Sequence, residues 1–473
     1  MAVIYSARWV LPISAPPIQA GAVAIAGSTI VAVGPRPQLL RDFPDATEKE
    51  FGDAVILPGL VNAHSHLELT VMRGFLEPEE HDFFAWLRKL TAARLRMTDE
   101  DLLVSATCGA IEAARAGITC LGDSSSIATQ AMRAMLNVGV RGIVYQESFG
   151  PDPKLATENF AKVRAQISEM RAGENDLVRA GVSPHAPYTV SAPQLEMIAR
   201  LAIDEKLPLM MHAAESKAEQ LLLTEGRGAF ADGLAQRGIA WKAPGVSTIR
   251  YLHDHGVLQA QPLLAHCINV DAADLQLIKD ARAAIAHCPK SNAKLRHGHA
   301  PFAELVQRGL TIGLGSDSVA SNNSCDILEE ARFATLLARV SEDRGSGSGA
   351  LSEHSSVSDL ALPDSRAAAT VTAEQALFAA TLGGARALGL DHHIGSLAPG
   401  RQADITVVNL TGAHQQPASN PLDTLIFSSS GRDVILTMVD GREIYRQQAI
   451  TTVSEPEIQR LAADVRNKID RPS

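Results

Sequence analysis

The segment Pro58-Gly59-Leu60-Val61-Asn62-Ala63-His64-Ser65-His66-Leu67-Glu68 is central to the interpretation of this chain, because an apolar run ends there in two histidines two residues apart. The run predicts a buried β-strand. Side chains alternate across a strand, so His64 and His66 are expected on one face. In a closed barrel that face is the interior, and the two imidazoles would converge at the carboxyl end of the strand. A bare His-x-His also occurs on surface loops and in cores, so other segments must supply further ligands.

The middle of the chain alternates short apolar runs with longer helical patterns at 102–116, 192–205 and 272–280, which is typical of a parallel sheet. Eight runs are predicted to be strands: 55–66, 118–124, 140–147, 179–185, 207–213, 262–267, 283–287 and 311–316. Eight βα units indicate a (β/α)₈ barrel, whose active site lies at the carboxyl ends of the strands. A doubly wound open sheet is the alternative, but no Gly-x-Gly-x-x-Gly turn opens its first helix.

The two ends of the chain have a different pattern. Residues 20–52, 403–408 and 434–441 contain short apolar runs separated by glycine turns, which predicts antiparallel β-structure. We therefore expect an α/β fold, with a TIM-like barrel at 58–390 and a small β-sandwich domain formed by 1–57 and 391–473, the latter with a terminal helix. Residues 341–370 are rich in glycine and serine and are interpreted as a flexible insertion.

Composition and charge exclude several classes of function. The net charge is −10, with 43 Lys and Arg against 53 Asp and Glu, and no basic cluster suggests a nucleic-acid partner. No apolar run approaches the ~20 residues needed to cross a bilayer. The five cysteines are scattered and lack Cys-x-x-Cys spacing, and the first residues carry no basic leader. We expect a cytoplasmic protein that acts on a small molecule, and homo-oligomerisation remains open.

Four predicted strands end in groups that can bind a metal or transfer a proton: His64 and His66 on the first, His212 followed by Glu215 on the fifth, His266 on the sixth and Asp317 on the eighth. Three imidazoles and one carboxylate suit Zn²⁺ best, with Fe²⁺ and Mn²⁺ as alternatives. A bound metal lowers the pKa of its water from about 15.7 towards ~7. Glu215 is then placed to carry protons, while His266 and Asp317 can orient the attacking oxygen.

The fourth predicted strand ends in Ser183-Pro184-His185-Ala186-Pro187-Tyr188, where two prolines restrict the backbone around His185. We interpret His185 as a group that forms a hydrogen bond to the substrate. The alternative is a structural histidine in a rigid turn.

Together, these motifs resemble the amidohydrolase superfamily, in particular its branch of aminohydrolases and chlorohydrolases. This branch includes S-adenosylhomocysteine and methylthioadenosine deaminases, guanine deaminase and triazine hydrolases. The resemblance covers nearly the whole chain, and it also rests on segments 72–74, 86–87, 183–191, 286–292, 315–323 and 394–400. It implies metal ligands at His64, His66, His212 and Asp317.

The resemblance further implies that Glu215 is the general acid and base, that His266 forms a hydrogen bond to the attacking hydroxide, and that His185 contacts the substrate ring. Two-metal members usually carry a carboxylated lysine on the fourth strand. No lysine lies near His185, so a mononuclear site with one Zn²⁺ per subunit is implied.

The implied reaction is hydrolytic deamination of an aminated heteroaromatic ring, with release of ammonia. The substrate would be an adenine nucleoside derivative, such as S-adenosylhomocysteine, methylthioadenosine or aminodeoxyfutalosine. A triazine-type chlorohydrolase or aminohydrolase and a guanine-type deaminase are alternatives on the same scaffold, and a non-catalytic scaffold protein is a remote one. In the reaction, Glu215 would protonate a ring nitrogen and then the departing ammonia, while His266 and Asp317 would stabilise the tetrahedral intermediate.

Two positions depart from the adenosine-derivative deaminases. Arg94 falls near a glutamate that those enzymes use to bind the ribose, and Gln146 falls near an arginine that they use to bind the substrate carboxylate. Glu68 could take over a ribose contact or could be a solvated residue at the strand end. The substrate class is therefore less closely defined than the metal site.

Overall fold

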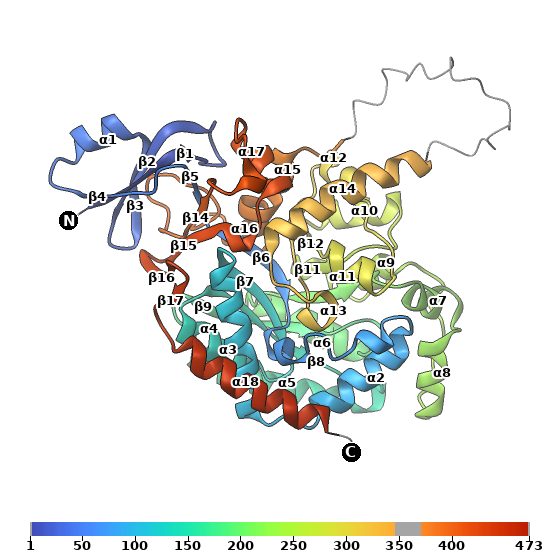
Figure 1. Cartoon of the computed structure of the whole chain (residues 1–473). Helices are drawn as coiled ribbons and strands as arrows, with labels where there is room; N and C mark the ends of the chain where they lie inside the picture. The colour runs from blue at the N-terminus through green and yellow to red at the C-terminus, as the bar shows by residue number, and fades with distance from the viewer. Residues whose placement is uncertain (1, 346–369, 472–473) are drawn as a thin grey trace, which may run out of the picture.

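A computed structural model describes residues 2–345 and 370–471 (Figure 1). Its centre is a barrel of eight parallel strands: β6 (Leu60–Ser65), β7 (Ile118–Ser125), β8 (Arg141–Ser148), β9 (Val178–Pro184), β10 (Met210–Ala213), β11 (Leu263–His266), β12 (Ala284–His287) and β13 (Thr311–Leu314). Hydrogen bonds group β6 to β9 and β10 to β13 into two four-stranded sheets. Isolated parallel bridges, Val182 with Leu209 and Ser65 with Asp317, join the two sheets into a closed ring. The predicted barrel is confirmed.

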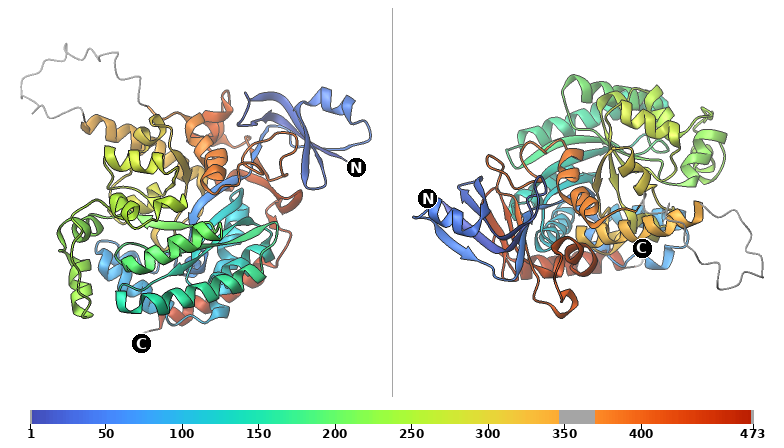
Figure 2. Two further views of the ribbon diagram at one scale, coloured as in Figure 1. Left: turned by 180° about the vertical axis from the view of Figure 1, so that it is seen from behind. Right: turned by 90° about the horizontal axis from the view of Figure 1, so that it is seen from above.

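Helices surround the barrel, as Figure 2 shows from two further directions. Those that connect or follow its strands are α2 (Phe83–Arg94), α3 (Asp99–Arg115), α4 (Ala128–Val138), α5 (Ala156–Ala172), α6 (Ala192–Asp204), α7 (Lys217–Glu225), α8 (Ala229–Gln236), α9 (Thr248–Asp254), α10 (Ala272–Asp280), α11 (Pro289–Lys294), α12 (Phe302–Gln307), α13 (Val319–Asn322), α14 (Ile327–Gly345), α15 (Ala373–Phe378) and α16 (Gly384–Ala387). Near the C-terminus lie α17 (Pro421–Asp423) and α18 (Glu455–Asp470).

Shorter helical turns complete these connections. The 3₁₀ turns are η1 (Leu67–Met72), η2 (Glu77–Glu79), η3 (Pro153–Leu155), η4 (Leu258–Ala260), η8 (Ala413–Gln415) and η10 (Gly431–Asp433), and the π-helical turns are η7 (Ala379–Gly383) and η9 (Thr424–Ser428). Of the predicted insertion at 341–370, residues 346–369 lie outside the described part of the chain.

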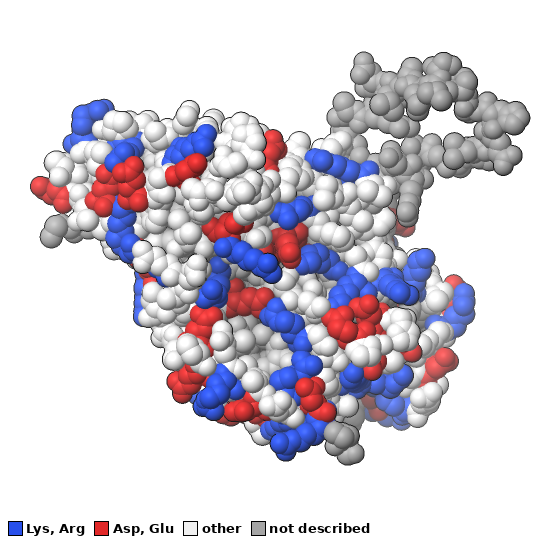
Figure 3. All heavy atoms as spheres, in the orientation of Figure 1, with Lys and Arg blue, Asp and Glu red and all other residues white. Residues whose placement is uncertain are grey.

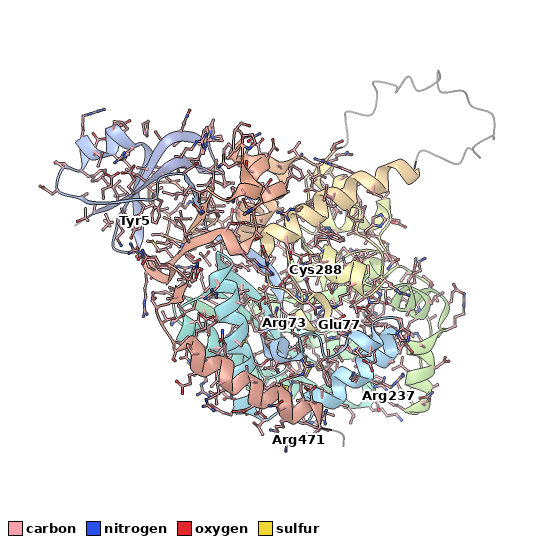
Figure 4. The ribbon with its side chains drawn as sticks, in the orientation of Figure 1. Tyr5, Arg73, Glu77, Arg237, Cys288 and Arg471 are labelled. Atoms are coloured by element: carbon pink, nitrogen blue, oxygen red, sulfur yellow. The ribbon has the colours of Figure 1, made fainter. Side chains whose placement is uncertain are left out.

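Strands from both ends of the chain form one mixed sheet of nine strands. Its strands are β1 (Val3–Val10), β2 (Ile18–Ala26), β3 (Thr29–Pro35), β4 (Thr47–Glu50), β5 (Ala54–Pro58), β14 (Ile405–Asn409), β15 (Val434–Val439), β16 (Arg442–Arg446) and β17 (Ala449–Ile450). The hydroxyl group of Tyr5, labelled in Figure 4, donates a hydrogen bond to Glu443 Oε1 at 3.0 Å and so joins the two ends. Val10, Ile56 and Leu436 belong to one shared apolar core.

Two local predictions are wrong. The run 55–66 is two strands, because β5 pairs with β1 and β14 in the terminal sheet, and only β6 enters the barrel. Gly59 lies between them, where a Cβ atom would approach Thr119 Oγ1 to 1.9 Å, so a larger residue would not fit at this crossing. The segment 20–52, predicted as β-structure, contains helix α1 (Arg36–Asp42), whose Leu39 is buried against Ala22 and Ala24.

The interior of the barrel is filled from the end opposite the strand carboxyl termini. Apolar side chains of the strands, including Ile143, Tyr145 and Met210, pack against Leu388 and Ile394. Space for a substrate is therefore left at the carboxyl ends of the strands.

The helices of the described residues include none with the length and apolar character of a membrane span. On the face drawn in Figure 3, acidic and basic side chains are interspersed.

Candidate active site

The histidines of the opening segment converge as expected, although β6 is not a regular strand. His64 Nε2 lies 3.4 Å and His66 Nε2 lies 3.5 Å from Asp317 Oδ1. The register of β6 against β7 shifts between Asn62 and Ser65, where β6 carries one extra residue. Simple alternation therefore does not describe this segment, and a bulge at the strand end contributes to the convergence.

His212, at the end of β10, faces the same point. Its Nε2 atom lies 3.3 Å from His66 Nε2, and its Nδ1 atom lies 2.9 Å from the carbonyl oxygen of His185. A carbonyl only accepts hydrogen bonds, so Nδ1 carries the proton and Nε2 keeps its lone pair. Burial lowers the pKa of His212 well below its ordinary value and that of His64 to about 4. Both imidazoles are therefore neutral at physiological pH, as metal ligation requires.

Asp317 follows β13 and is held by two hydroxyl groups. Ser291 Oγ donates to its Oδ2 at 2.6 Å and Ser321 Oγ donates to the same oxygen at 3.1 Å, which leaves Oδ1 facing the histidines. Burial opposes ionisation, but the imidazoles around the carboxylate, first of all His64 with its Nε2 atom 3.4 Å from Oδ1, hold the pKa of this carboxyl well below its usual range. Asp317 is therefore an ionised ligand candidate.

These donors fit a metal ion. Among the described residues, three overlapping groups place their donor atoms within 4.8 Å of one another: His64 with His212 and His266, His64 with His66 and Asp317, and His66 with Glu147 and His212. Both ring nitrogens of His64 are buried and have no hydrogen-bond partner in the protein. A buried polar atom without a partner is costly, and a cation bound between His64 Nε2 and the Asp317 carboxylate would remove that cost for one of the two nitrogens.

Glu215 lies beside the histidine cluster. Its Oε1 atom is 3.8 Å from His266 Nε2 and 3.6 Å from His297 Nε2, and Tyr188 donates a hydrogen bond of 3.5 Å to its Oε2. His266 Nδ1 lies 2.8 Å from Asn292 Oδ1, so the His266 Nε2 atom is left to face the site. This arrangement places a carboxylate that is able to transfer protons, and an imidazole that is able to form hydrogen bonds, next to the ligand candidates.

His185 occupies a different place. Its ring centroid lies 4.6 Å from that of His212, and its Nδ1 atom lies 2.9 Å from Thr189 Oγ1. Burial lowers the pKa of His185 to about 3, so the ring is neutral. The ring lines the cavity, where a neutral imidazole can form a hydrogen bond to a heteroaromatic substrate.

The structure adds three residues that the sequence reasoning did not select. Glu147, at the end of β8, has Oε1 3.8 Å from His66 Nδ1, and burial raises its pKa to about 7. Its position at a strand end is the same signal that identified the other residues. His297 follows α11, where no strand end marks it. Glu219 accepts hydrogen bonds from the backbone nitrogens of Ala214 and Glu215.

Arg94 and Gln146, the two positions that depart from the adenosine-derivative deaminases, lie in different parts of the structure. Arg94 lines the cavity, where its Nε atom lies 3.2 Å from Glu68 Oε1. Glu68 is buried and also accepts a hydrogen bond of 2.7 Å from Ser126 Oγ, so it is not a solvated residue. Gln146 is buried outside the cavity lining, and its side-chain nitrogen donates to the carbonyl oxygen of Ser126 at 2.8 Å.

All of the predicted site residues except His64 line a single cavity of about 510 Å³ at the carboxyl ends of the strands. His64 is fully buried beneath it and contacts its floor through Asp317. A cavity of this size suits a small organic molecule.

The chain is similar to known proteins over nearly its whole length. The model of the Amidohydrolase family matches residues 55–444, and a model described as an imidazolonepropionase-like composite domain of bacteria matches 21–46. The 5-methylthioadenosine/S-adenosylhomocysteine deaminase of Pelotomaculum thermopropionicum is 30% identical over 447 residues, which cover 93% of this chain and 91% of that protein. The 5'-deoxyadenosine deaminase of Methanothermobacter thermautotrophicus is 30% identical over 411 residues, 86% of each chain.

Among solved structures, an adenosine deaminase from Xanthomonas campestris with bound zinc has a TM-score of 0.82 and 26% sequence identity. The match covers 99% of this chain and 98% of that one. The similarity thus includes both the barrel and the sheet formed by the two ends.

Proposed function

Because the chain belongs to the amidohydrolase family, we propose that it is a metal-dependent hydrolytic deaminase of adenine nucleoside derivatives. The observation that carries the proposal is the convergence of four ligand candidates beside Glu215 and His266 at one end of the barrel. The three relatives named above are deaminases of adenosine or of its derivatives, which supports the substrate class.

The proposed ligands of one Zn²⁺ per subunit are His64, His66, His212 and Asp317, with Fe²⁺ and Mn²⁺ as alternatives. The zinc in the Xanthomonas campestris structure supports this choice. When bound, the metal supplies a water of lowered pKa, so that a nucleophile is available at neutral pH.

The residues of the chain account for the remaining chemistry. His185 would contact the heteroaromatic ring and orient it in the cavity. Water adds to the carbon that carries the amino group, and Glu215 moves the released proton to a ring nitrogen. Glu215 then takes the proton of the new hydroxyl group and delivers it to the amino nitrogen, so that the carbon–nitrogen bond breaks, ammonia leaves and a carbonyl group forms. His266 and Asp317 would stabilise the tetrahedral intermediate from the side of the cavity floor.

The proposal is tested by a panel of adenosine derivatives with zinc-loaded enzyme, followed by ultraviolet absorbance and by ammonia release. We expect deamination of at least one member and loss of activity in Glu215→Gln with metal content retained. Glu158→Gln, which removes an exposed carboxylate on α5, is the matched control and should behave as the wild type. A metal-replete enzyme that deaminates no member would refute the proposal.

A further inference from the structure

The mouth of the cavity is apolar. Its outer wall is formed largely by helix α2 and the turn that follows it, with Phe149 on another side. The apolar side chains there are Phe83, Trp86, Leu87, Leu90, Leu95 and Phe149. These side chains come from α2, from the residue after it and from the residue after β8, whereas the ligand and catalytic candidates lie at or near the strand ends.

Two of these side chains are unusually exposed. Leu95 is 79% and Phe149 is 46% accessible to solvent. Single exposed apolar residues are common, but these two belong to a set of six around one opening. An apolar group bound at the mouth would remove this surface from water, which favours binding.

The mouth offers no free charge for a zwitterionic ligand. Arg94 is the only Lys or Arg among the described residues that line the cavity. Its Nε atom pairs with the buried carboxylate of Glu68, which neutralises its charge, and its Nη2 atom donates to Ser126 Oγ. Glu68 is in turn held by Arg94 and by the Ser126 hydroxyl and backbone nitrogen, so it is not available to an ammonium group. A charged substituent would lose hydration here, and the only cationic side chain it could meet among the described lining residues is already neutralised by Glu68.

Polar contacts hold the segment that leads into α2. Arg73 and Glu77, both labelled in Figure 4, precede α2 in the chain. Arg73 donates a hydrogen bond to the carbonyl oxygen of Asn323, and Asn323 Nδ2 donates to Glu77 Oε1 at 2.6 Å. Lys294 Nζ forms an ion pair of 2.6 Å with the same Glu77 oxygen. These contacts anchor the segment before α2 to α11 and α13.

We propose that this mouth binds an uncharged apolar substituent of the substrate, of alkylthio to arylthio size, at the end of the molecule remote from the aminated ring. It would disfavour the zwitterionic amino-acid tail of S-adenosylhomocysteine. This inference rests on the proposed function and narrows its substrate class.

The test compares kcat/KM for methylthioadenosine, 5'-phenylthio-5'-deoxyadenosine and S-adenosylhomocysteine with the zinc-loaded enzyme. We expect both apolar derivatives to exceed S-adenosylhomocysteine by about tenfold or more, since buried charges without partners are strongly rejected. Leu90→Lys places a cation in the wall and should reduce kcat/KM for the apolar derivatives by about tenfold, with a smaller loss for S-adenosylhomocysteine. Leu155→Lys, at an exposed leucine outside the cavity, is the matched control and should leave all three values unchanged.

Two outcomes would overturn the inference in distinguishable ways. Equal or faster deamination of S-adenosylhomocysteine would refute the apolar mouth and leave the deaminase function standing. Absence of deamination for every derivative, with metal bound, would refute the proposed function and the inference together.

Discussion

Glu219 provides the sharpest test of how Glu215, the proposed proton-transfer carboxylate, is positioned. This buried residue on α7 accepts hydrogen bonds from the Ala214 nitrogen at 2.9 Å, the Glu215 nitrogen at 3.1 Å and Thr248 Oγ1 at 2.8 Å. Ala214 has a φ angle of +53°, in the left-handed region. We infer that the Glu219 carboxylate stabilises the unusual turn that carries Glu215 into the cavity.

The Glu219→Gln substitution removes one of the two backbone acceptors, because the amide nitrogen donates and cannot accept. One buried N–H group then lacks a partner, at a cost of about 1–3 kcal/mol. The left-handed Ala214 adds roughly 1–2 kcal/mol that favours relaxation of the turn. A displacement of a catalytic group by about 1 Å can cost about 100-fold in rate, so we expect kcat to fall by roughly 10- to 100-fold.

The zinc content and KM should change little, because His212 is held independently by the carbonyl oxygen of His185. The assay is steady-state deamination with metal analysis and circular dichroism of the same preparation. Thr248→Val is the matched control, since it removes a contact to the same carboxylate but keeps both backbone hydrogen bonds; its kcat should stay within about threefold of the wild type. A folded, zinc-replete Glu219→Gln enzyme with wild-type kcat would refute the positioning role.

Three further predictions concern the metal and the stability of the fold. His212→Ala should abolish stoichiometric zinc binding and activity, measured by elemental analysis and turnover; retention of both would exclude His212 as a ligand. Chelation of the wild-type enzyme should lower its melting temperature, and added Zn²⁺ should restore it, because a ligand that binds only the folded state stabilises it. An unchanged melting curve would contradict the proposal that these residues bind a metal ion. Burial raises the pKa of Glu330 to about 8 from an ordinary 4.5. The protonated form is thus favoured in the folded state, and its contribution to the free energy of unfolding is complete below pH 4.5 and lost as the pH rises through about 8. We therefore compare the melting temperatures of Glu330→Gln and the wild type at about pH 5.5 and about pH 8.5. The difference, variant minus wild type, should be more positive at about pH 8.5. A difference that does not change with pH would disprove this.

The barrel was predictable from sequence because its strands are short apolar runs, each followed by a helix pattern. The prediction of one strand at 55–66 was wrong because its two halves pair in two different sheets. Residues 55–66 form a continuous apolar run because β5 is buried in the terminal sheet and β6 in the barrel, and hydrophobicity does not record this change of sheet. Helix α1 was missed because its alternation of apolar and polar residues is short and only Leu39 is buried.

The rule that site residues follow the ends of barrel strands identified residues that lie together in the structure, but Glu147 also follows this rule and was not selected. Glu147 ends β8 in the same way that His212 ends β10, and it lies near His66. It closes the predicted strand 140–147, but it was not among the candidate site residues. Glu219 and His297 could not be found by that rule, since they reach the site from α7 and from the segment after α11, through contacts formed only by tertiary packing.

Backbone strain is the feature of this site that no side-chain pattern reveals. Ala214, His266 and Asp317 have φ angles of +53°, +75° and +57°, although none is glycine. Such conformations cost about 1–3 kcal/mol each and persist only where surrounding contacts hold them. Here the contacts are the Glu219 carboxylate beneath Ala214 and the bond from the Asp317 nitrogen to the carbonyl oxygen of His64. The same hydrogen bonds that offset the strain hold the segments from which Glu215 and Asp317 line the cavity, so the geometry of the site depends on residues that need not touch a substrate.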